Sequence, residues 1–467
     1  MNKVLSVGID IGTTTTQIVF SELTIQNTAG SFLVPRIKIV DKNIIYKSNI
    51  YFTPLVSRET IDLLELEHII EKEYDMACVK KDDISTGAII MTGETARKEN
   101  AEKILNILSD FAGDFVIATA GADLESILAG CGSGAMETSK NISGKVMNFD
   151  IGGGTTNVSV FQNGKIADCF ALDIGGRLIQ LDSEGNTIYI SHKIMPLIEN
   201  LNLNIRIGIK AEFMDLYNLC KKFAHIILKI GNKVDLSDEE VRLFIGHENR
   251  KFKTEVFMFS GGVAEFVYSD YEVAKLEDTL KYGDIGPLLG NCIRDSLKEK
   301  NYSFMETKEK IRATVIGAGS HSVKISGSTI VFDENILPMK NVPIIKAEND
   351  LPQNDIYKYV SHKISMYCNS PVAVSFRGPV SPSYAQIQKM ADSIIQCFKV
   401  IRNFPIIVIV ENDFAKALGQ AIKIKCELNR KVICLDGIST ENGDYIDIGR
   451  AISGVIPVSV KTLIFDN

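Results

Sequence analysis

Two stretches of the chain repeat one short pattern, and this repeat restricts the possible fold more than any other feature. They are residues 7–20, VGIDIGTTTTQIVF, and residues 147–160, MNFDIGGGTTNVSV. Aligned with Asp150 over Asp10, at an offset of 140 residues, both have Asp, Ile and Gly, then Thr-Thr, then an amide side chain and alternating apolar residues. Each stretch predicts a buried strand, a tight turn of small residues and a second strand, which together make a β-hairpin.

The composition of the two turns indicates a site for a polyphosphate. Glycine lets the backbone come close to a ligand and present consecutive N–H groups to an anion, and threonine hydroxyls add neutral donors. An aspartate at the end of the strand would repel a phosphate, but it can hold the hydration shell of Mg²⁺, which takes one or two carboxylates together with phosphate oxygens. A single hairpin of this kind could be ordinary turn chemistry, whereas two copies in register favour a nucleotide site between two related lobes.

This pair of hairpins resembles the two phosphate motifs of the actin–Hsp70–sugar kinase superfamily. The resemblance implies an α/β fold with duplicated ATPase lobes and ATP bound in the cleft between them. It also implies that Asp10 and Asp150 act in catalysis and hold Mg²⁺ through water. The phosphate contacts that it implies are Gly12, Thr13, Thr14, Thr15 and Thr16 in the first hairpin and Gly152, Gly153, Gly154, Thr155 and Thr156 in the second.

Two later segments match further parts of the superfamily pattern. Residues 256–265, VFMFSGGVAE, predict a buried strand that ends in a Gly-Gly turn at a helix start, which implies that Gly261 and Gly262 lie against adenosine. Residues 120–134 predict a helix capped by Gly130. In the superfamily the corresponding helix links the lobes and carries an acidic residue near the attacking water. Glu125 or Asp123 could take that catalytic role, and the alternative is that these acids only favour a helix start.

The order of motifs predicts three regions: residues 1–145 as the first lobe, 146–336 as the second, and 337–467 as a C-terminal α/β region. Residues 313–321, ATVIGAGSH, predict a second small-residue turn that either lines the nucleotide or packs as an ordinary strand–turn–helix. Proline and asparagine from Leu337 onward predict a linker. Beyond it, apolar runs alternate with helical segments, which is typical of an α/β unit; they are residues 371–376, 384–400, 405–410, 414–424 and 432–435, followed by a hairpin at 442–449 and a strand at 455–464.

Composition excludes several classes of partner. The net charge of −7 argues against nucleic acid and anionic membrane surfaces, because binding them needs a basic footprint. No apolar run approaches a membrane span, and the N-terminus lacks a signal-peptide pattern. Nine cysteines without a C-x-x-C pair indicate reduced thiols, and six scattered histidines argue against a transition-metal site. We therefore expect a cytoplasmic protein.

Together with the hairpin that begins at residue 7, five sets of residues cover nearly the whole chain and resemble a more specific family, the reactivating factors of ethanolamine ammonia-lyase. They are TAGADLESILAG (119–130), FSGGVAE (259–265), DIGPLL (284–289), GAGSH (317–321) with SGSTI (326–330), and GDYIDIG (443–449). The resemblance implies an ATP-driven chaperone that, with ATP and Mg²⁺, loosens the lyase so that damaged cobalamin leaves and intact adenosylcobalamin enters. Ethanolamine ammonia-lyase is then the partner, and the cobalamin acts on that partner rather than being held here. The implied location is the bacterial cytoplasm, with the ethanolamine microcompartment as a further expectation.

Other functions remain open from the residues alone. One is a small-molecule kinase of the same superfamily with a sugar or acetate acceptor, and another is an actin-like protein that polymerises with nucleotide. A regulatory module that binds ATP and hardly hydrolyses it is a third, because no residue is securely identified as the base that orients the attacking water.

Overall fold

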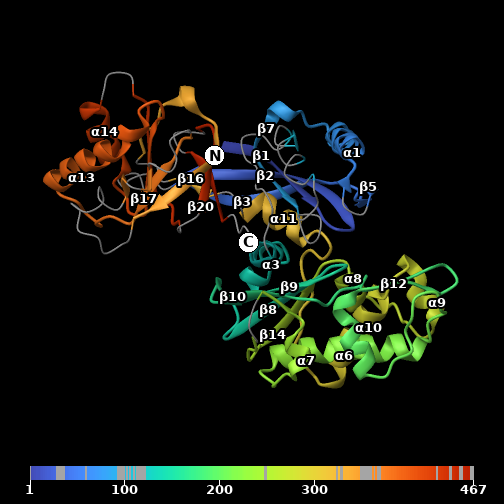
Figure 1. Ribbon diagram of the computed structural model, residues 1–467. Coiled ribbons are helices and arrows are strands. Elements are labelled where there is room, and N and C mark those ends of the chain that lie inside the picture. The colour runs from blue at the N-terminus through green and yellow to red at the C-terminus, as the bar shows by residue number, and fades with distance from the viewer. Residues whose placement is uncertain are drawn as a thin grey trace.

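The computed structural model contains three large sheets (Figure 1). Two of them have five strands each and the third has seven. The residues that the structure describes are 2–27, 37–57, 60–91, 100, 104, 107–108, 111, 122–246, 250–321, 324–326, 330–347, 360–361, 363–364, 370–426, 430–440, 444–451 and 456–462. Each sheet packs on its own core of buried apolar side chains.

The first sheet is formed by the N-terminal part of the chain. β1 and β2 form an antiparallel hairpin, β3 pairs antiparallel with β2, β7 runs parallel to β1, and β4 pairs with the start of β2. The elements are β1 (Asn2–Ile11), β2 (Thr15–Asn27), β3 (Ile37–Lys47), β4 (Tyr51–Phe52), β5 (Leu55–Ser57), β6 (Thr60–Ile61), α1 (Leu63–Met76) and β7 (Ile84–Met91). Helix α1 begins where the Asp62 side chain accepts a hydrogen bond from the Glu65 N–H, and its Leu66 and Ile70 pack in the same core as Ile9.

The second sheet repeats this topology. β8 and β9 form an antiparallel hairpin, β10 pairs with β9, and β14 runs parallel to β8, while β13 pairs with β10. The elements of this part are α4 (Ala135–Thr138), β8 (Lys145–Ile151), β9 (Thr156–Gln162), β10 (Lys165–Leu172), β11 (Ile179–Leu181), β12 (Thr187–Ile190), α5 (Met195–Asn200), α6 (Phe213–Gly231), α7 (Asp238–Val241), β13 (Phe244–Ile245), β14 (Val256–Ser260), α8 (Ala264–Val267), α9 (Leu276–Thr279) and α10 (Gly286–Glu299). The long amphipathic helices α6 and α10 pack against each other in the largest core of the molecule. The two repeated stretches of sequence are therefore two equivalent hairpins in two equivalent sheets.

Two helices cross between these sheets and pack against each other (Figure 1). Helix α3 (Ala122–Gly132) packs on β9 and β10 of the second sheet, and α11 (Ala313–His321) packs on β1, β2 and β7 of the first. The two helices approach closely at two glycines, which have no Cβ. A Cβ on Gly132 would lie 1.9 Å from the Ala313 carbonyl oxygen, and one on Gly317 would lie 2.0 Å from the Leu128 carbonyl oxygen. Helix α3 therefore follows the first lobe in the sequence but packs on the second, and α11 follows the second lobe but packs on the first.

These helices correct two sequence predictions. Residues 313–321 form a helix and not a small-residue turn, because Gly317 serves helix–helix contact rather than a bend. Helix α3 does not end at Gly130 but continues to Gly132, and a Cβ on Gly130 would lie 2.2 Å from Ser159 Oγ. The residue that adopts the left-handed conformation is Gly134, with φ of +88°.

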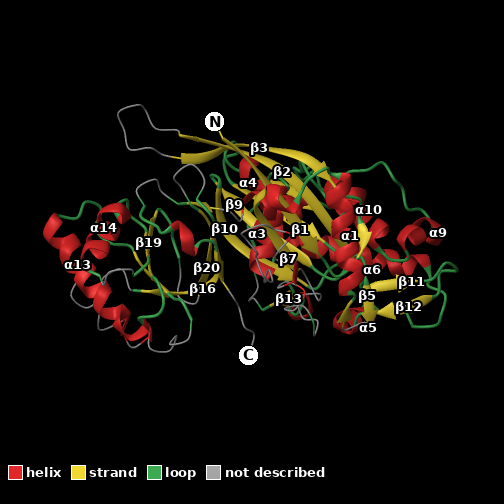
Figure 2. Ribbon diagram, turned by 90° about the horizontal axis from the view of Figure 1, so that it is seen from above, coloured by secondary structure: helices red, strands yellow, loops and turns green. Residues whose placement is uncertain are grey.

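The third sheet forms the C-terminal unit, in the order β15-β21-β20-β16-β17-β18-β19. Strands β16 to β19 are parallel, and α13 and α14 cover one face of the sheet (Figure 2). The elements are β15 (Lys324–Ile325), β16 (Met339–Lys346), β17 (Ala373–Phe376), α13 (Tyr384–Cys397), β18 (Ile406–Val410), α14 (Ala415–Lys425), β19 (Val432–Asp436), β20 (Asp444–Ile448) and β21 (Pro457–Thr462). The predicted fold class, α/β with two related lobes and a C-terminal α/β unit, is confirmed.

The linker predicted from Leu337 is wrong, because this stretch contains the strand β16. Pro343 is tolerated there beside a register shift between β16 and β20, where strand prolines commonly occur. The domain boundaries themselves remain a proposal. Since β15 pairs with β21 and Val331 bridges to Cys434, we propose that the C-terminal unit begins before Lys324 rather than after residue 336.

Within the described residues, no helix combines the length and the apolar character needed to cross a membrane. Every cysteine that the structure describes is a free thiol.

Candidate functional site

The turns of the two repeated hairpins have the same geometry. The Gly12 N–H donates to the Thr15 carbonyl at 2.9 Å, and the Gly152 N–H donates to the Thr155 carbonyl at 3.0 Å. Asp10 is paired in register with Gln17, and Asp150 is paired in register with Asn157. The sequence repeat therefore reflects a repeated backbone shape, with an aspartate at the end of each first strand.

The two turns lie against each other. A Cβ on Gly153 would lie 3.0 Å from Thr14 Oγ1. The Thr14 hydroxyl of the first turn therefore lies against Gly153 of the second turn, where no side chain is present. A Cβ on Gly152 would meet no atom closer than 3.6 Å, and a Cβ on Gly154 would meet none within 4 Å. The glycine turn is thus open on the side where a ligand could approach its backbone, which fits a phosphate group.

Two of the predicted phosphate contacts point into the protein instead. The Thr16 hydroxyl is buried at 3.1 Å from Thr53 Oγ1, and the buried Thr156 hydroxyl donates to the Ile174 carbonyl at 2.7 Å. Thr53 also donates from Oγ1 to the Gly12 carbonyl at 2.7 Å. These side chains support the turns from behind, so we remove Thr16 and Thr156 from the proposed phosphate contacts.

Asp150 lies at the centre of a buried hydrogen-bond network. Its Oδ1 accepts from Ser260 Oγ at 2.6 Å, its Oδ2 accepts from Thr314 Oγ1 at 3.4 Å, and Ser260 Oγ in turn accepts from Asn148 Nδ2 at 2.8 Å. Burial raises the pKa of the Asp150 carboxyl to about 6, although both hydroxyl donors oppose this change. Thr314 belongs to α11, so this network ties the second turn to a crossing helix that the sequence had indicated as a turn.

Asp10 occupies the equivalent position in the first hairpin and is also buried. Its cross-strand neighbour Gln17 donates from Nε2 to the Ile311 carbonyl at 3.2 Å, just before α11. No group of three or more His, Cys, Asp or Glu side chains suited to a metal occurs in the described part of the chain. Two aspartates suit Mg²⁺, because this ion is commonly held by one or two carboxylates while water and phosphate oxygens fill the rest of its coordination shell.

The predicted adenosine turn lies directly beside the second hairpin turn, since β14 pairs with β8 and aligns Ser260 with Asp150. Gly261 adopts φ of +83°, and a Cβ there would lie 2.4 Å from the Ile151 carbonyl oxygen, so only glycine fits. A Cβ on Gly262 would meet nothing closer than Ile311 Cδ1 at 3.8 Å. Gly262 therefore leaves its backbone open, as contact with a purine requires.

Glu125, the predicted catalytic acid, lies half-buried on α3. Asp123 is on the same helix, and its side chain lies outside the described residues. The role of either acid near an attacking water stays a prediction.

Sequence reasoning missed two charged residues beside the second turn. Arg177 follows β10, and its N–H donates to the Gly153 carbonyl at 2.7 Å, while its Nε lies 3.9 Å from Asp284 Oδ2. Asp284 lies two residues before Gly286, the first residue of α10. Asp284 lies in the segment DIGPLL, which the sequence had marked only through family resemblance.

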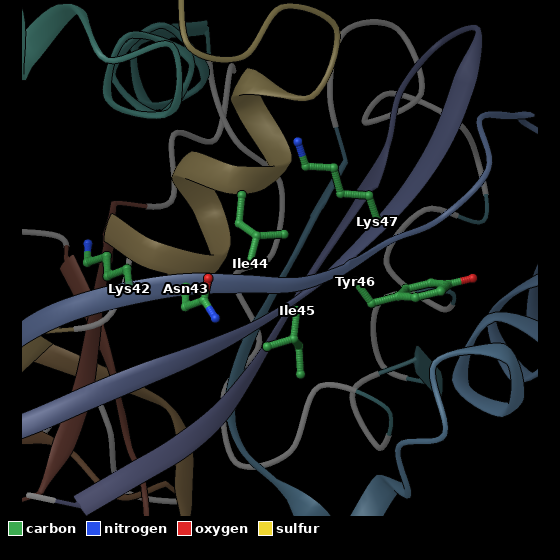
Figure 3. Close-up of a pocket in the computed structure, with 6 residues that line it drawn as sticks. All are labelled: Lys42, Asn43, Ile44, Ile45, Tyr46 and Lys47. Atoms are coloured by element: carbon green, nitrogen blue, oxygen red, sulfur yellow. The ribbon is translucent and has the colours of Figure 1, made fainter.

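A separate cavity of about 490 Å³ lies along β3 of the first lobe (Figure 3). It is lined by residues 42–47 and includes none of the predicted nucleotide contacts. It is therefore distinct from the candidate site.

Comparison with known proteins identifies the family of this chain. The family model of the ethanolamine utilisation protein EutA matches residues 2–466. The ethanolamine ammonia-lyase reactivase EutA of Salmonella typhimurium strain LT2 is 32% identical over 469 residues, and that of Escherichia coli strain K12 is 34% identical over 477 residues; each alignment covers 99% of both chains.

Solved structures give weaker matches. The PPX-GPPA enzyme of Aquifex aeolicus aligns with a TM-score of 0.41 at 14% identity, over 68% of this chain and 99% of its own. The ethanolamine utilisation protein EutJ of Carboxydothermus hydrogenoformans aligns with a TM-score of 0.33 at 14% identity, over 68% of this chain and 90% of its own. Because the family model spans almost every residue and both relatives exceed 30% identity over nearly their full length, this chain belongs to the EutA family of ethanolamine utilisation proteins.

Proposed function

We propose that this chain is an ATP-dependent reactivase of ethanolamine ammonia-lyase, which releases damaged cobalamin from the lyase so that intact adenosylcobalamin can bind. The observation that carries this proposal is the full-length match to two relatives that are named as reactivases of that lyase. The facing hairpin turns supply a physical basis for the use of nucleotide. The bacterial cytoplasm and the ethanolamine microcompartment are the locations that we propose for it.

The proposed nucleotide site uses residues from both lobes. Backbone N–H groups of Gly153 and Gly154 and the hydroxyls of Thr13 and Thr14 would bind the phosphates from opposite sides. The remaining turn residues, Gly12, Thr15, Gly152 and Thr155, shape the two turns, and Gly261 and Gly262 would face the adenosine. Asp10 and Asp150 would hold Mg²⁺ through water, and the ion would neutralise charge on the phosphates during transfer to water.

The arrangement also explains how hydrolysis could move the lobes. A terminal phosphate that bonds to both turns joins the two hairpins, and its loss removes that joint. Asp150 contacts Thr314 on α11, and α11 packs tightly on α3 through Gly132 and Gly317. A change at the second turn therefore reaches the helix pair that lies between the lobes. The ATP and ADP states must differ in affinity for the lyase, because otherwise hydrolysis is not coupled to reactivation.

The test is to reactivate purified ethanolamine ammonia-lyase that has been blocked with cyanocobalamin. This protein, adenosylcobalamin and Mg²⁺ are added with and without ATP, and both the recovered lyase activity and the released cyanocobalamin are measured. We expect recovery that requires ATP and that disappears in the Asp150→Asn variant. Asp168→Asn is the matched control, because Asp168 is a partly exposed aspartate on β10 of the same lobe.

Failure to reactivate the lyase, with ATP binding intact, would contradict the proposal. Turnover of ATP that needs an added sugar or acetate would then favour a small-molecule kinase. Light scattering that rises on addition of ATP and Mg²⁺ would favour an actin-like polymer.

A further inference from the structure

Arg177 lies directly on the second phosphate turn. A Cβ on Gly153 would lie 3.3 Å from Arg177 Cδ and 3.4 Å from its Cγ, so the aliphatic part of the side chain passes beside that glycine. Thr14 of the opposite turn lies at the same glycine, with Oγ1 at 3.0 Å from the same position. The backbone is held as well, because the N–H groups of Gly176 and Arg177 donate to the carbonyls of Gly152 and Gly153. Any group bound between the turns would have the Arg177 guanidinium as a neighbour.

The guanidinium retains most of its binding capacity. Its one ion pair within the described residues is with Asp284, at 3.9 Å, which is longer than a hydrogen bond. The Arg177 side chain is 31% exposed. At this separation the pair lacks a charge-assisted hydrogen bond, whereas a planar guanidinium suits bidentate hydrogen bonds to phosphate oxygens. The pair is therefore loose enough for Arg177 to leave it for a stronger anion.

Asp284, unlike the Arg177 side chain, is held in place by a hydrogen bond and by burial. Its Oδ1 accepts from the Gly286 N–H at 2.9 Å at the start of α10, and the residue is buried. Burial raises the pKa of Asp284 to about 6, and the Gly286 N–H and the Arg177 charge oppose this change. Helix α10 is anchored in the core of the second lobe by residues such as Ile293 and Leu297.

We propose that Arg177 binds the terminal phosphate and distinguishes ATP from ADP, and that Asp284 is a positioning residue that holds Arg177 when no terminal phosphate is present. This inference rests on the proposed nucleotide site. With a terminal phosphate, the guanidinium bonds to it across the Gly153 turn. Without one, it pairs with Asp284, so the start of α10 gains or loses a cationic neighbour as the nucleotide changes.

Calorimetric titration of the full chain with Mg²⁺ tests this assignment, with ADP and a non-hydrolysable ATP analogue as ligands. For Arg177→Gln we expect the analogue to bind about 10- to 100-fold more weakly and ADP to change by less than about threefold, because only the analogue loses charge-assisted hydrogen bonds. Arg177→Lys should recover part of the loss. Asp284→Asn keeps the acceptor for the Gly286 N–H and should bind the analogue at least as tightly as the wild type.

Arg250→Gln is the control, since Arg250 pairs with Asp168 in the same lobe with similar exposure and should leave both affinities unchanged. A structural role for Arg177 would alter the affinities for both nucleotides alike, and that result, or no change for either one, overturns the assignment.

Hydrogen exchange at the start of α10 gives a second readout: the exchange rate should differ between the ATP-analogue and ADP states in the wild type and not in Asp284→Asn. If Arg177→Gln does not fold, Arg177→Lys must still lower the ratio of the two affinities. A wild type that binds neither nucleotide refutes the proposed nucleotide use itself, a result that is distinct from the failure of Arg177 alone.

Discussion

Replacement of Asp150 by Asn should stabilise the second lobe while it removes a proposed Mg²⁺ ligand. Burial raises the pKa of Asp150 from its usual 3.8 to about 6 in the folded chain. Between these values the folded state keeps a proton that the unfolded state has released, so stability falls as the pH rises through this window and stays lower above it. An amide carries no charge and avoids this loss.

The size of the effect follows from the size of the pKa change. At about 1.4 kcal/mol per unit, Asp150→Asn should gain about 3 kcal/mol at pH 8 and about half of that at pH 5. The hydrogen bonds can be kept, because the amide oxygen can accept from Ser260 and the amide nitrogen can donate to Thr314. For a lobe of this size, a gain of about 3 kcal/mol corresponds to a rise of roughly 6 to 12 °C in the melting temperature.

Thermal unfolding at pH 5 and pH 8, with EDTA and without nucleotide, measures the difference between the variant and the wild type. Asp168→Asn is the control and should show no comparable gain. Addition of Mg²⁺ and nucleotide should stabilise the wild type more than the variant, because the buried carboxylate then has a cation to bind. A variant that is no more stable than the wild type at pH 8, or a gain that does not depend on pH, would refute the reasoning.

Three further predictions concern the first hairpin, the crossing helices and a buried charge. Asp10→Asn should lower Mg²⁺-ATP turnover at least about tenfold with an unchanged circular dichroism spectrum, and unchanged turnover would refute the metal role. Gly317→Ala should lower stability by about 2 kcal/mol or more in thermal unfolding, because the new Cβ would lie 2.0 Å from the Leu128 carbonyl oxygen and outweigh the better helix propensity of alanine; equal stability would contradict the close helix contact. Lys229→Met should cost about 1 to 3 kcal/mol in urea unfolding, since the fully buried Glu240 loses two hydrogen bonds of 2.9 Å, and a neutral result would show that its second partner, Lys222, suffices alone.

Sequence reasoning worked best where the signal was local. Asp10 and Asp150 stand at the ends of strands whose alternating apolar residues identify them, and the small residues that follow specify the turns. It failed where a residue type has two uses. Gly317 read as a turn residue, but it allows two helices to approach, and Pro343 read as part of a linker, but it lies in a strand beside a register shift.

The orientation of individual side chains could not be predicted for a similar reason. Thr14 and Thr16 belong to one run of threonines, yet Thr14 lies against the opposite turn and Thr16 is buried against Thr53. Thr14 lies in the turn before β2, whereas Thr16 lies within the strand, so no strand periodicity relates their two side chains. What each hydroxyl meets depends on what packs against the turn and against the sheet.

The sequence by itself determined that the chain contains two equivalent hairpins with turns of glycine and threonine, a Gly-Gly turn after a buried strand, and a further α/β unit, because these features depend on residues close together in the chain. The family was equally visible in the order of its segments. Only the tertiary structure decided that Thr14 meets Gly153, that Thr314 reaches Asp150, and that Arg177 lies between the second hairpin turn and Asp284. These contacts join residues from 24 to 164 positions apart, and such distances are set by how whole helices and sheets pack, which no local pattern records.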